Sequence, residues 1–270
     1  TQDVVDTATM LQVRQGFKVL GVPLTVMAER LVELADAHRD TPVMGRTFLQ
    51  DARATTFGAK TALWLSGVLD HIHRMADLDS RLPLQLGGPV GDGASYGPKW
   101  PAVAEEMATR LGLIVPVAPW HTDRRVVAEI AAFVGGVAST MAKIGVDVAL
   151  LAQGGEVRVR PGRSSSMPDK RNPIDSIRAI AAGQVCGVAV TGLVSAPPPE
   201  RERSLGGWHA EGAMLPIAFQ AGAAAVAAMG AGLASLEVDE ARMAEKAGSA
   251  APDTDALIDA VLAAYRDVVG

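Results

Sequence analysis

Two long segments of this 270-residue chain are apolar almost all round, and they restrict its possible folds more than any other feature. They cover residues 125–153 and 210–236, and a helix without a polar face has to be covered on every side. The second segment is long enough to suggest a membrane span, but it is built mainly from Ala and Gly, and Glu211 and Gln220 interrupt it. Small side chains allow helices to approach closely, so we expect a tightly packed bundle, an oligomer and no membrane partner.

Other segments have the periodicity of amphipathic helices. In the first of them the apolar residues recur at steps of four and three, at Leu20, Leu24, Met27, Leu31 and Leu34. This spacing predicts a helix over about residues 7–37, bent at Pro23. Leu65, Val68, Ile72 and Met75 repeat the pattern, and residues 253–269 predict one more short amphipathic helix.

The chain is therefore expected to be all-α, with two readable linkers. Residues 82–101 are rich in Gly and Pro, and residues 196–207 contain three prolines before a Glu-Arg-Glu-Arg run. We expect a long central helical-bundle domain over residues 1–236 and a short C-terminal helical segment over residues 237–270.

Composition excludes several classes of protein. The single cysteine, Cys186, rules out an internal disulfide, and no signal peptide precedes the first motif, so we expect a cytoplasmic protein. A net charge of -5 and 4% aromatic residues argue against a nucleic-acid-binding surface. The sequence has no metal-ligand spacing, and its glycines at 87, 88 and 91 do not form GxGxxG, so we expect neither a metal nor a cofactor.

A short cationic stretch is the strongest functional signal in the residues themselves. Residues 158–171 hold one acid, Asp169, and five basic residues: Arg158, Arg160, Arg163, Lys170 and Arg171. Such a local positive field attracts carboxylates or phosphates. The loop is followed by a predicted helix start, with Asn172 as the cap, Pro173 at the first helical position and Asp175 near the positive end of the dipole. Free N–H groups at a helix start favour an anion, although Ser and Pro are also typical of an ordinary connector.

Residues 164–173, with the sequence SSSMPDKRNP, resemble the GSSxMPxKxNP signature of the fumarase/aspartase superfamily, lyases that form or break a bond beside a carboxylate. Three further segments resemble the bacterial 3-carboxy-cis,cis-muconate cycloisomerases of that superfamily. They are residues 1–14 (TSQDVxDTAxxLQxR in the family), 46–58 (RTWLQ, then TxG) and 200–211 (EHERS and GxWHAE), with a weaker likeness at 119–122. In that family the first segment follows a separate amino-terminal domain, so the resemblance implies that this domain is absent here.

The resemblance also implies roles for particular residues. The first serine of the signature, Ser164, would transfer the proton, and Lys170 and Asn172 would contact the substrate. Thr47 and Gln50 match residues that bind another part of the substrate. A serine hydroxyl becomes a base only where its surroundings favour the alkoxide, and the nearby cations and helix start act in that direction.

Arginines and histidines supply further candidates. Arg163 adds charge to the loop, and Arg203 is a candidate bidentate clamp for a second carboxylate. Arg203 is equally compatible with an exposed salt bridge to Glu200 or Glu202. His209 and His121 have the pKa range of an acid or base, although each is also compatible with a structural or surface role. Asp3 and Asp6 are expected to cap or orient the first helix.

Several positions depart from the family pattern: Phe48, Asp51, Arg163, Asp169 and Arg201. At 51, 169 and 201 the family carries histidine. If one of those histidines is the usual proton donor, this chain either uses another group or performs a related reaction on a different polyanion.

The resemblance implies a cofactor-free, metal-free cycloisomerase that converts 3-carboxy-cis,cis-muconate to a carboxymuconolactone in the breakdown of aromatic acids such as protocatechuate, through β-ketoadipate. Such a reaction passes through an aci-carboxylate, which fixed cations and N–H donors stabilise. The resemblance further implies a homotetramer whose active sites combine motif regions from different subunits. Two alternatives stay open: a β-elimination lyase acting on a substituted succinate or another polyanion, and a non-catalytic helical scaffold.

Overall fold

The computed structural model describes residues 1–162, 166–167, 169–196, 199–248 and 250–269. Within these ranges the chain is mostly helical, which confirms the all-α prediction. The α-helices are α1 (Gln2–Ala37), α2 (Phe57–Ser80), α3 (Trp100–Leu111), α4 (Arg125–Gln153), α5 (Ile174–Val194), α6 (Gly207–Ala234), α7 (Glu240–Ala247) and α8 (Asp255–Val269). The short strands are β1 (Pro42–Thr47), β2 (Gln50–Thr56), β3 (Val157–Arg158), β4 (Pro161–Gly162), β5 (Asn172–Pro173) and β6 (Glu237–Val238), and one 3-10 helix, η1, covers Ala94–Lys99.

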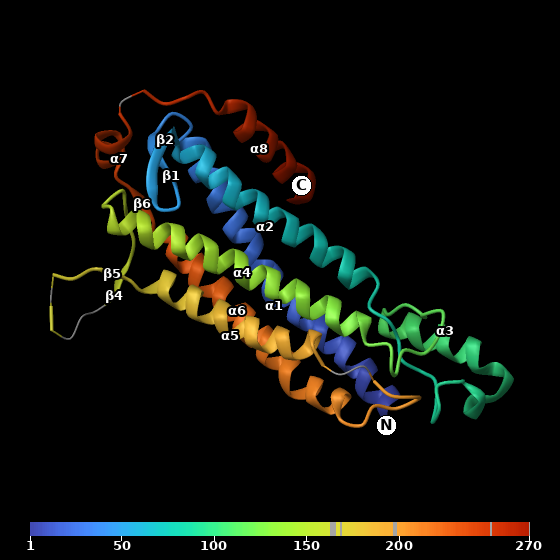
Figure 1. The fold of residues 1–270 in the computed structure, drawn as a ribbon. Helices are drawn as coiled ribbons and strands as arrows, with labels where there is room; N and C mark the ends of the chain where they lie inside the picture. Colours follow the sequence, from blue (N-terminus) through green and yellow to red (C-terminus); the bar gives the residue numbers. More distant parts are fainter. Residues whose placement is uncertain (163–165, 168, 197–198, 249, 270) are drawn as a thin grey trace.

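Five long helices, α1, α2, α4, α5 and α6, run along one another as an elongated bundle (Figure 1). Helix α3 lies at the end of the bundle where the chain begins, together with the start of α6 (Figure 1). The β1–β2 hairpin, the β4–β5 pair and α7 lie at the opposite end, and α8 lies along α2. The bundle therefore has two ends that carry different motif regions.

The first predicted apolar stripe forms the buried side of α1. Its five residues, Leu20, Leu24, Met27, Leu31 and Leu34, are at most 3% exposed. The helix begins at Gln2 rather than near residue 7, and Pro23 lies inside one uninterrupted element. Sequence periodicity missed the first turns because their buried residues include the polar side chains Gln2 and Asp6.

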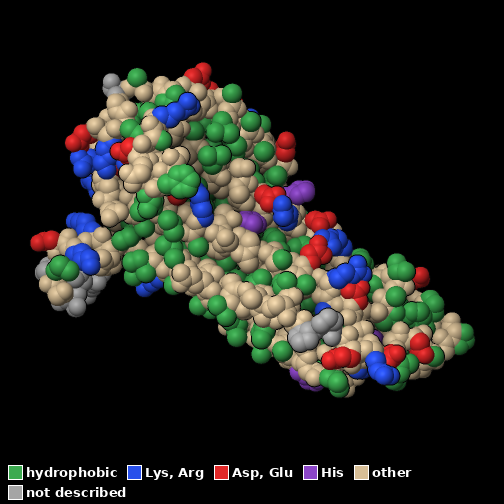
Figure 2. Space-filling view, viewed as in Figure 1, with side chains coloured by type: hydrophobic (Ala, Val, Ile, Leu, Met, Phe, Trp, Pro, Cys, Tyr) green, Lys and Arg blue, Asp and Glu red, His purple; other side chains and the backbone are tan. Residues whose placement is uncertain are grey.

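Helix α4 has the predicted bounds, and α6 begins and ends within three residues of the predicted segment. The helices α4, α5 and α6 are all long and apolar enough to cross a membrane by length and composition alone. Helix α5 is the least covered of them, with Val185, Val188 and Val194 between 53% and 76% exposed. Figure 2 shows few charged side chains along the middle of the bundle, where α5 faces the viewer.

Three elements were not expected from the sequence: η1, α3 and the β1–β2 hairpin. Part of the predicted 82–101 linker forms η1, and α3 begins at Trp100. The motif at 46–50 forms the tip of the β1–β2 hairpin, where Phe48 and Leu49 have φ angles of 50° and 61°. Glycine or asparagine normally marks such a turn, so two bulky residues there gave no sequence signal.

The signature loop is closed at its base by an antiparallel pairing of Gly162 with Asn172. The prediction that Asn172 caps the next helix is wrong, because its backbone pairs in β5 and Pro173 is the residue before α5. Asp175 lies in the first helical turn, as expected. The predicted helix near the C-terminus is confirmed as α8.

Candidate active site

The candidate site residues divide between the two ends of the bundle. Helix α1 has 36 residues and so spans roughly 54 Å at about 1.5 Å per residue. Arg203 and His209 line a cavity with Thr1, Gln2 and Asp3 at the beginning of α1, and His121 contacts Asp3. Thr47 and Gln50 belong to the β1–β2 hairpin, which follows the end of α1 (Figure 1). We call the first group, with Asp3, the amino-terminal cluster, and the second, with Lys170 and Asn172, the loop cluster.

In the loop cluster a buried ion pair holds the hairpin. The guanidinium of Arg46 donates to both carboxylate oxygens of Glu156, at 3.0 Å each, and Glu156 is 0% exposed. The same guanidinium donates to Asp51 at 2.9 Å. Thr47 and Gln50 are exposed and face each other across the turn. Asp51, which stands where the resembling family has histidine, is thus a partner of Arg46.

The signature loop is described only in part. Ser164 and Arg163 lie outside the described residues, so their predicted roles stay predictions. Lys170 is exposed and its backbone N–H donates to Met167 O at 3.1 Å, which forms a tight turn. Asn172 is half-buried at the base of the loop. The loop therefore presents Lys170 to solvent close to the start of α5.

Two of the five predicted loop cations are paired with acids from elsewhere in the chain. Arg158 donates to Asp239 at 2.5 Å, and Arg160 donates to both oxygens of Asp175 at 2.7 and 2.9 Å. The pKa of the Asp239 carboxylate lies below its ordinary value, chiefly because Arg158 donates a hydrogen bond to it. The positive field of the segment is therefore weaker than the sequence predicted.

Three members of the amino-terminal cluster, Asp3, Arg203 and His209, border a cavity of about 480 Å³. It is lined by Thr1, Gln2, Asp3, Gly88, Pro89, Tyr96, Arg203, Ser204, Trp208 and His209. Arg203 donates to the backbone oxygens of Gly88 (2.6 Å) and Glu202 (2.7 Å). The Glu200 carboxylate instead accepts from the Leu205 N–H at 2.9 Å. Neither salt bridge considered for Arg203 occurs among the described residues, and its role as an anion clamp stays a prediction.

Asp3 is fixed against one wall of this cavity. Its carboxylate accepts from the Gly88 N–H at 2.8 Å and the Tyr96 hydroxyl at 3.0 Å, and it contacts His121 Nε2. Burial acts to raise the pKa of Asp3, but these donors outweigh it and the pKa lies below its ordinary value. The prediction that Asp3 caps α1 is wrong, because Thr1 is the residue before the helix and Asp3 lies in its first turn, where it lines the same cavity as Arg203.

His121 is 3% exposed, and burial holds its pKa below the ordinary histidine value, although the hydrogen bond with Asp3 opposes this effect. A neutral ring donates through Nε2 to Asp3, which leaves Nδ1 as an acceptor. That Nδ1 is buried and has no hydrogen-bond partner among the described residues.

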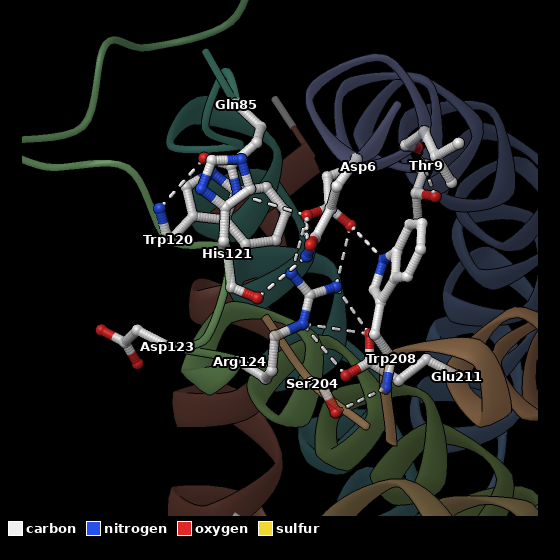
Figure 3. Close-up of polar contacts among 12 residues, drawn as sticks. Asp6, Thr9, Gln85, Trp120, His121, Asp123, Arg124, Ser204, Trp208 and Glu211 are labelled. Carbon is white, nitrogen blue, oxygen red and sulfur yellow. Dashed lines mark hydrogen bonds and ion pairs between the residues drawn. The ribbon is translucent and has the colours of Figure 1, made fainter. Parts of the chain in front are cut away.

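Asp6 and Arg124 form the centre of a buried polar network that sequence analysis missed (Figure 3). Asp6 is 1% exposed and accepts five hydrogen bonds of 2.9–3.2 Å, two from Arg124 and one each from Gln2, Gln85 and Trp208. Arg124 also donates to Glu211, at 2.6–3.1 Å. Burial acts to lower the pKa of Arg124, but its carboxylate partners hold it above the ordinary value. The motif segments at 1–14 and 200–211 contain Asp6, Trp208 and Glu211, but their sequence did not show that these residues meet at Arg124.

A second cavity, of about 460 Å³, lies between α1 and α6. It shares Trp208 and His209 with the first cavity and has Asp6, Arg124 and Glu211 at its polar end. The exposed His209 ring meets the Trp208 ring edge-on, with centroids 4.9 Å apart. In the part of the chain that the structure describes, no group of three or more His, Cys, Asp or Glu residues is placed to hold a metal ion.

Comparison with known proteins relates this geometry to a family. A profile of the family described as Lyase matches residues 1–187. A 3-carboxy-cis,cis-muconate cycloisomerase of Pseudomonas aeruginosa is 41% identical over 256 residues, which are 92% of this chain and 56% of that protein. A nitrosuccinate lyase of Streptomyces davaonensis is 40% identical over 226 residues, covering 78% of this chain and 48% of that protein.

The crystal structure of 3-carboxy-cis,cis-muconate lactonizing enzyme from Pseudomonas putida superimposes with a TM-score of 0.84 at 34% identity, over 99% of this chain and 65% of that one. The chain thus spans somewhat more than half the length of the muconate-cycloisomerase relatives that it matches. The profile match over most of the chain, together with the helical bundle, shows that the chain belongs to the lyase family and has the fold of the fumarase/aspartase superfamily.

Proposed function

We propose that the full-length protein converts 3-carboxy-cis,cis-muconate to a carboxymuconolactone without a metal or cofactor, in the breakdown of aromatic acids. The observation that carries this proposal is the signature at 164–173, whose last two residues form β5 directly before the first turn of α5. The 41% identity to a muconate cycloisomerase supports the choice of reaction.

In this proposal the loop stabilises negative charge while a proton moves at carbon. The first turn of α5 has no side-chain cap, so its N–H groups and Lys170 can face an oxyanion. Asn172 at the loop base and Thr47 and Gln50 on the hairpin would hold the rest of the substrate. Ser164 would transfer the proton at the carbon beside the carboxylate.

We propose further that copies of the chain assemble, as a homotetramer, so that each site combines clusters from different copies. Support comes from the roughly 54 Å helix that separates the loop cluster from the amino-terminal cluster within one chain. Val19 and Val22 on α1 and Val188 on α5 are 61%, 69% and 76% exposed. Apolar patches left exposed on the helices of a bundle mark interaction surfaces. We infer that other copies rather than lipid cover them, which suits a soluble cytoplasmic enzyme.

The test is a substrate panel with the full-length protein. Loss of muconate absorbance with formation of the lactone supports the proposal. A specific observation favours a second candidate, a β-elimination lyase: the nitrosuccinate lyase is 40% identical, and Asp51, Asp169 and Arg201 replace expected histidines. Release of an alkene from a substituted succinate, with muconate left intact, would select that reaction. If the protein turns over neither substrate class, the remaining alternative is the non-catalytic helical scaffold.

A further inference from the structure

His209 lies on the wall that the two cavities share. The charged groups that line these cavities with it are Asp3, Asp6, Arg124, Arg203 and Glu211. An exposed imidazole between acidic and basic groups is accessible both to solvent and to a bound anion. Whether the His209 ring can exchange protons with a bound ligand depends on what holds the ring in place.

Local capping of the helix turn that carries His209 is limited to one long hydrogen bond, from the Trp208 N–H to Ser204 Oγ at 3.4 Å. Helix α6 starts after Gly206, which has a φ of 130° and provides no side-chain cap. Residues 208 and 211 are three apart and so share one side of the helix. Trp208 Nε1 donates to Asp6 at 2.9 Å, and the Glu211 carboxylate binds Arg124. The turn is therefore fastened to α1 and to the start of α4 (Figure 3).

This fastening determines where His209 points. The next residue along a helix is rotated by about 100°, so His209 lies beside the anchored side of the turn, where its ring meets the Trp208 ring edge-on with centroids 4.9 Å apart. Asp6 is saturated by five donors and nearly inaccessible to water, so its position is fixed. A change in the Trp208–Asp6 contact should therefore be felt at His209.

The other candidate histidine lacks this freedom. His121 does not line either cavity, and its Nε2 is engaged by Asp3. Its ring is also enclosed by backbone, because a Cβ at Gly87 would lie 2.8 Å from its Cε1 and one at Gly91 would lie 3.2 Å from its Nδ1. His121 is therefore suited to orienting Asp3 rather than to exchanging protons with a ligand.

We propose that His209 exchanges protons with a carboxylate-bearing ligand bound where the two cavities that it lines meet. We propose further that Asp6, acting through Trp208, is the positioning residue of His209. The exchange breaks one imidazolium N–H bond and delivers that proton to the ligand, after which solvent water returns a proton to the ring. The link to the muconate reaction rests on the proposed function, whereas the contacts among Asp6, Trp208 and His209 do not depend on it.

The test uses Trp208→Phe in the full-length protein, since this variant keeps an aromatic side chain but removes the indole N–H that binds Asp6, whereas Asp6→Asn also disturbs the buried Arg124. Trp64→Phe is the matched control, because Trp64 Nε1 donates to Asp147 at 2.7 Å in a different part of the bundle. Modification of each histidine by diethyl pyrocarbonate is followed across pH by peptide mass spectrometry. Turnover is measured in parallel.

We expect His209 to react about tenfold or more faster than His121, and a muconate or succinate ligand to slow its modification. Trp208→Phe should move the pH midpoint of His209 modification and lower kcat roughly tenfold, as expected for one hydrogen bond to a charged group. Trp64→Phe should change neither quantity.

Equal reactivity of the two histidines, or an unmoved midpoint in Trp208→Phe, would overturn the proposal, because a merely structural tryptophan would alter stability alone. A moved midpoint without turnover of muconate retains the positioning role and removes the proposed reaction. Turnover of muconate with an unmoved His209 midpoint in Trp208→Phe retains the proposed reaction and removes the positioning role.

Discussion

Replacing Arg46 by Met should destabilise the protein strongly, because it leaves a buried carboxylate without its bidentate partner. Glu156 is 0% exposed and takes both of its close hydrogen bonds from Arg46. Removing one partner of a buried ion pair typically costs about 3–5 kcal/mol. The Arg46 side chain is 27% exposed, and Lys246 Nζ lies 4.0 Å from Glu156, so both water and a second cation soften the loss. We therefore expect about 3 kcal/mol.

Two variants make this number testable. Arg74→Met is the matched control, because Arg74 pairs with Asp70 on the surface, with side chains 67% and 52% exposed. Its loss should cost less than about 0.5 kcal/mol. Adding Glu156→Gln to Arg46→Met removes the stranded charge, so the double variant should recover at least half of the lost stability. Both expectations follow from desolvation rather than from the number of contacts.

The assay is urea unfolding at one fixed protein concentration, since assembly makes apparent stability concentration-dependent. A cost for Arg46→Met no larger than that for Arg74→Met would refute the reasoning. So would a double variant less stable than Arg46→Met alone, because the penalty would then not come from an unpaired buried charge.

Three further predictions follow from single residues. Ser164→Ala should lower kcat by roughly 100-fold or more and leave the unfolding midpoint unchanged, as steady-state kinetics and thermal denaturation can show; an unchanged kcat would remove Ser164 from its role. Burial holds the pKa of His71 below 6.5, so the unfolded chain binds more protons, and the free energy of unfolding should fall as pH drops below about 6.5. His71→Gln should flatten that dependence, and an unaltered slope would contradict the assignment. Burial raises the pKa of Cys186 to about 11, so iodoacetamide at pH 8 should label it only after unfolding; rapid labelling of the native protein would count against the buried position.

The helices could be predicted where one physical property dominated a long stretch. The unbroken apolar run of α4 gave its bounds, and the stripe from Leu20 to Leu34 gave the buried side of α1. The hairpin could not be predicted, because Phe48 and Leu49 adopt positive φ without the glycine or asparagine that usually signals such a turn.

Site residues were predictable only where a motif named them. Asp6 and Arg124 are 118 positions apart, and nothing in either local sequence shows that they meet. Nothing in the local sequence of Arg160 shows that it forms an ion pair with Asp175, which lies in the helix that follows. Local charge counting therefore overestimated the field at the loop, and it missed the network that fixes the start of α6.

Hybrid complementation tests most directly whether separated clusters from different copies form one site. Full-length Ser164→Ala and Arg203→Ala carry lesions at opposite ends of the bundle, and we expect each to be inactive alone. Co-assembled, they should regain muconate turnover, because some sites would then receive an intact loop from one copy and an intact amino-terminal cluster from another. A co-assembled mixture as inactive as its parents would contradict the account.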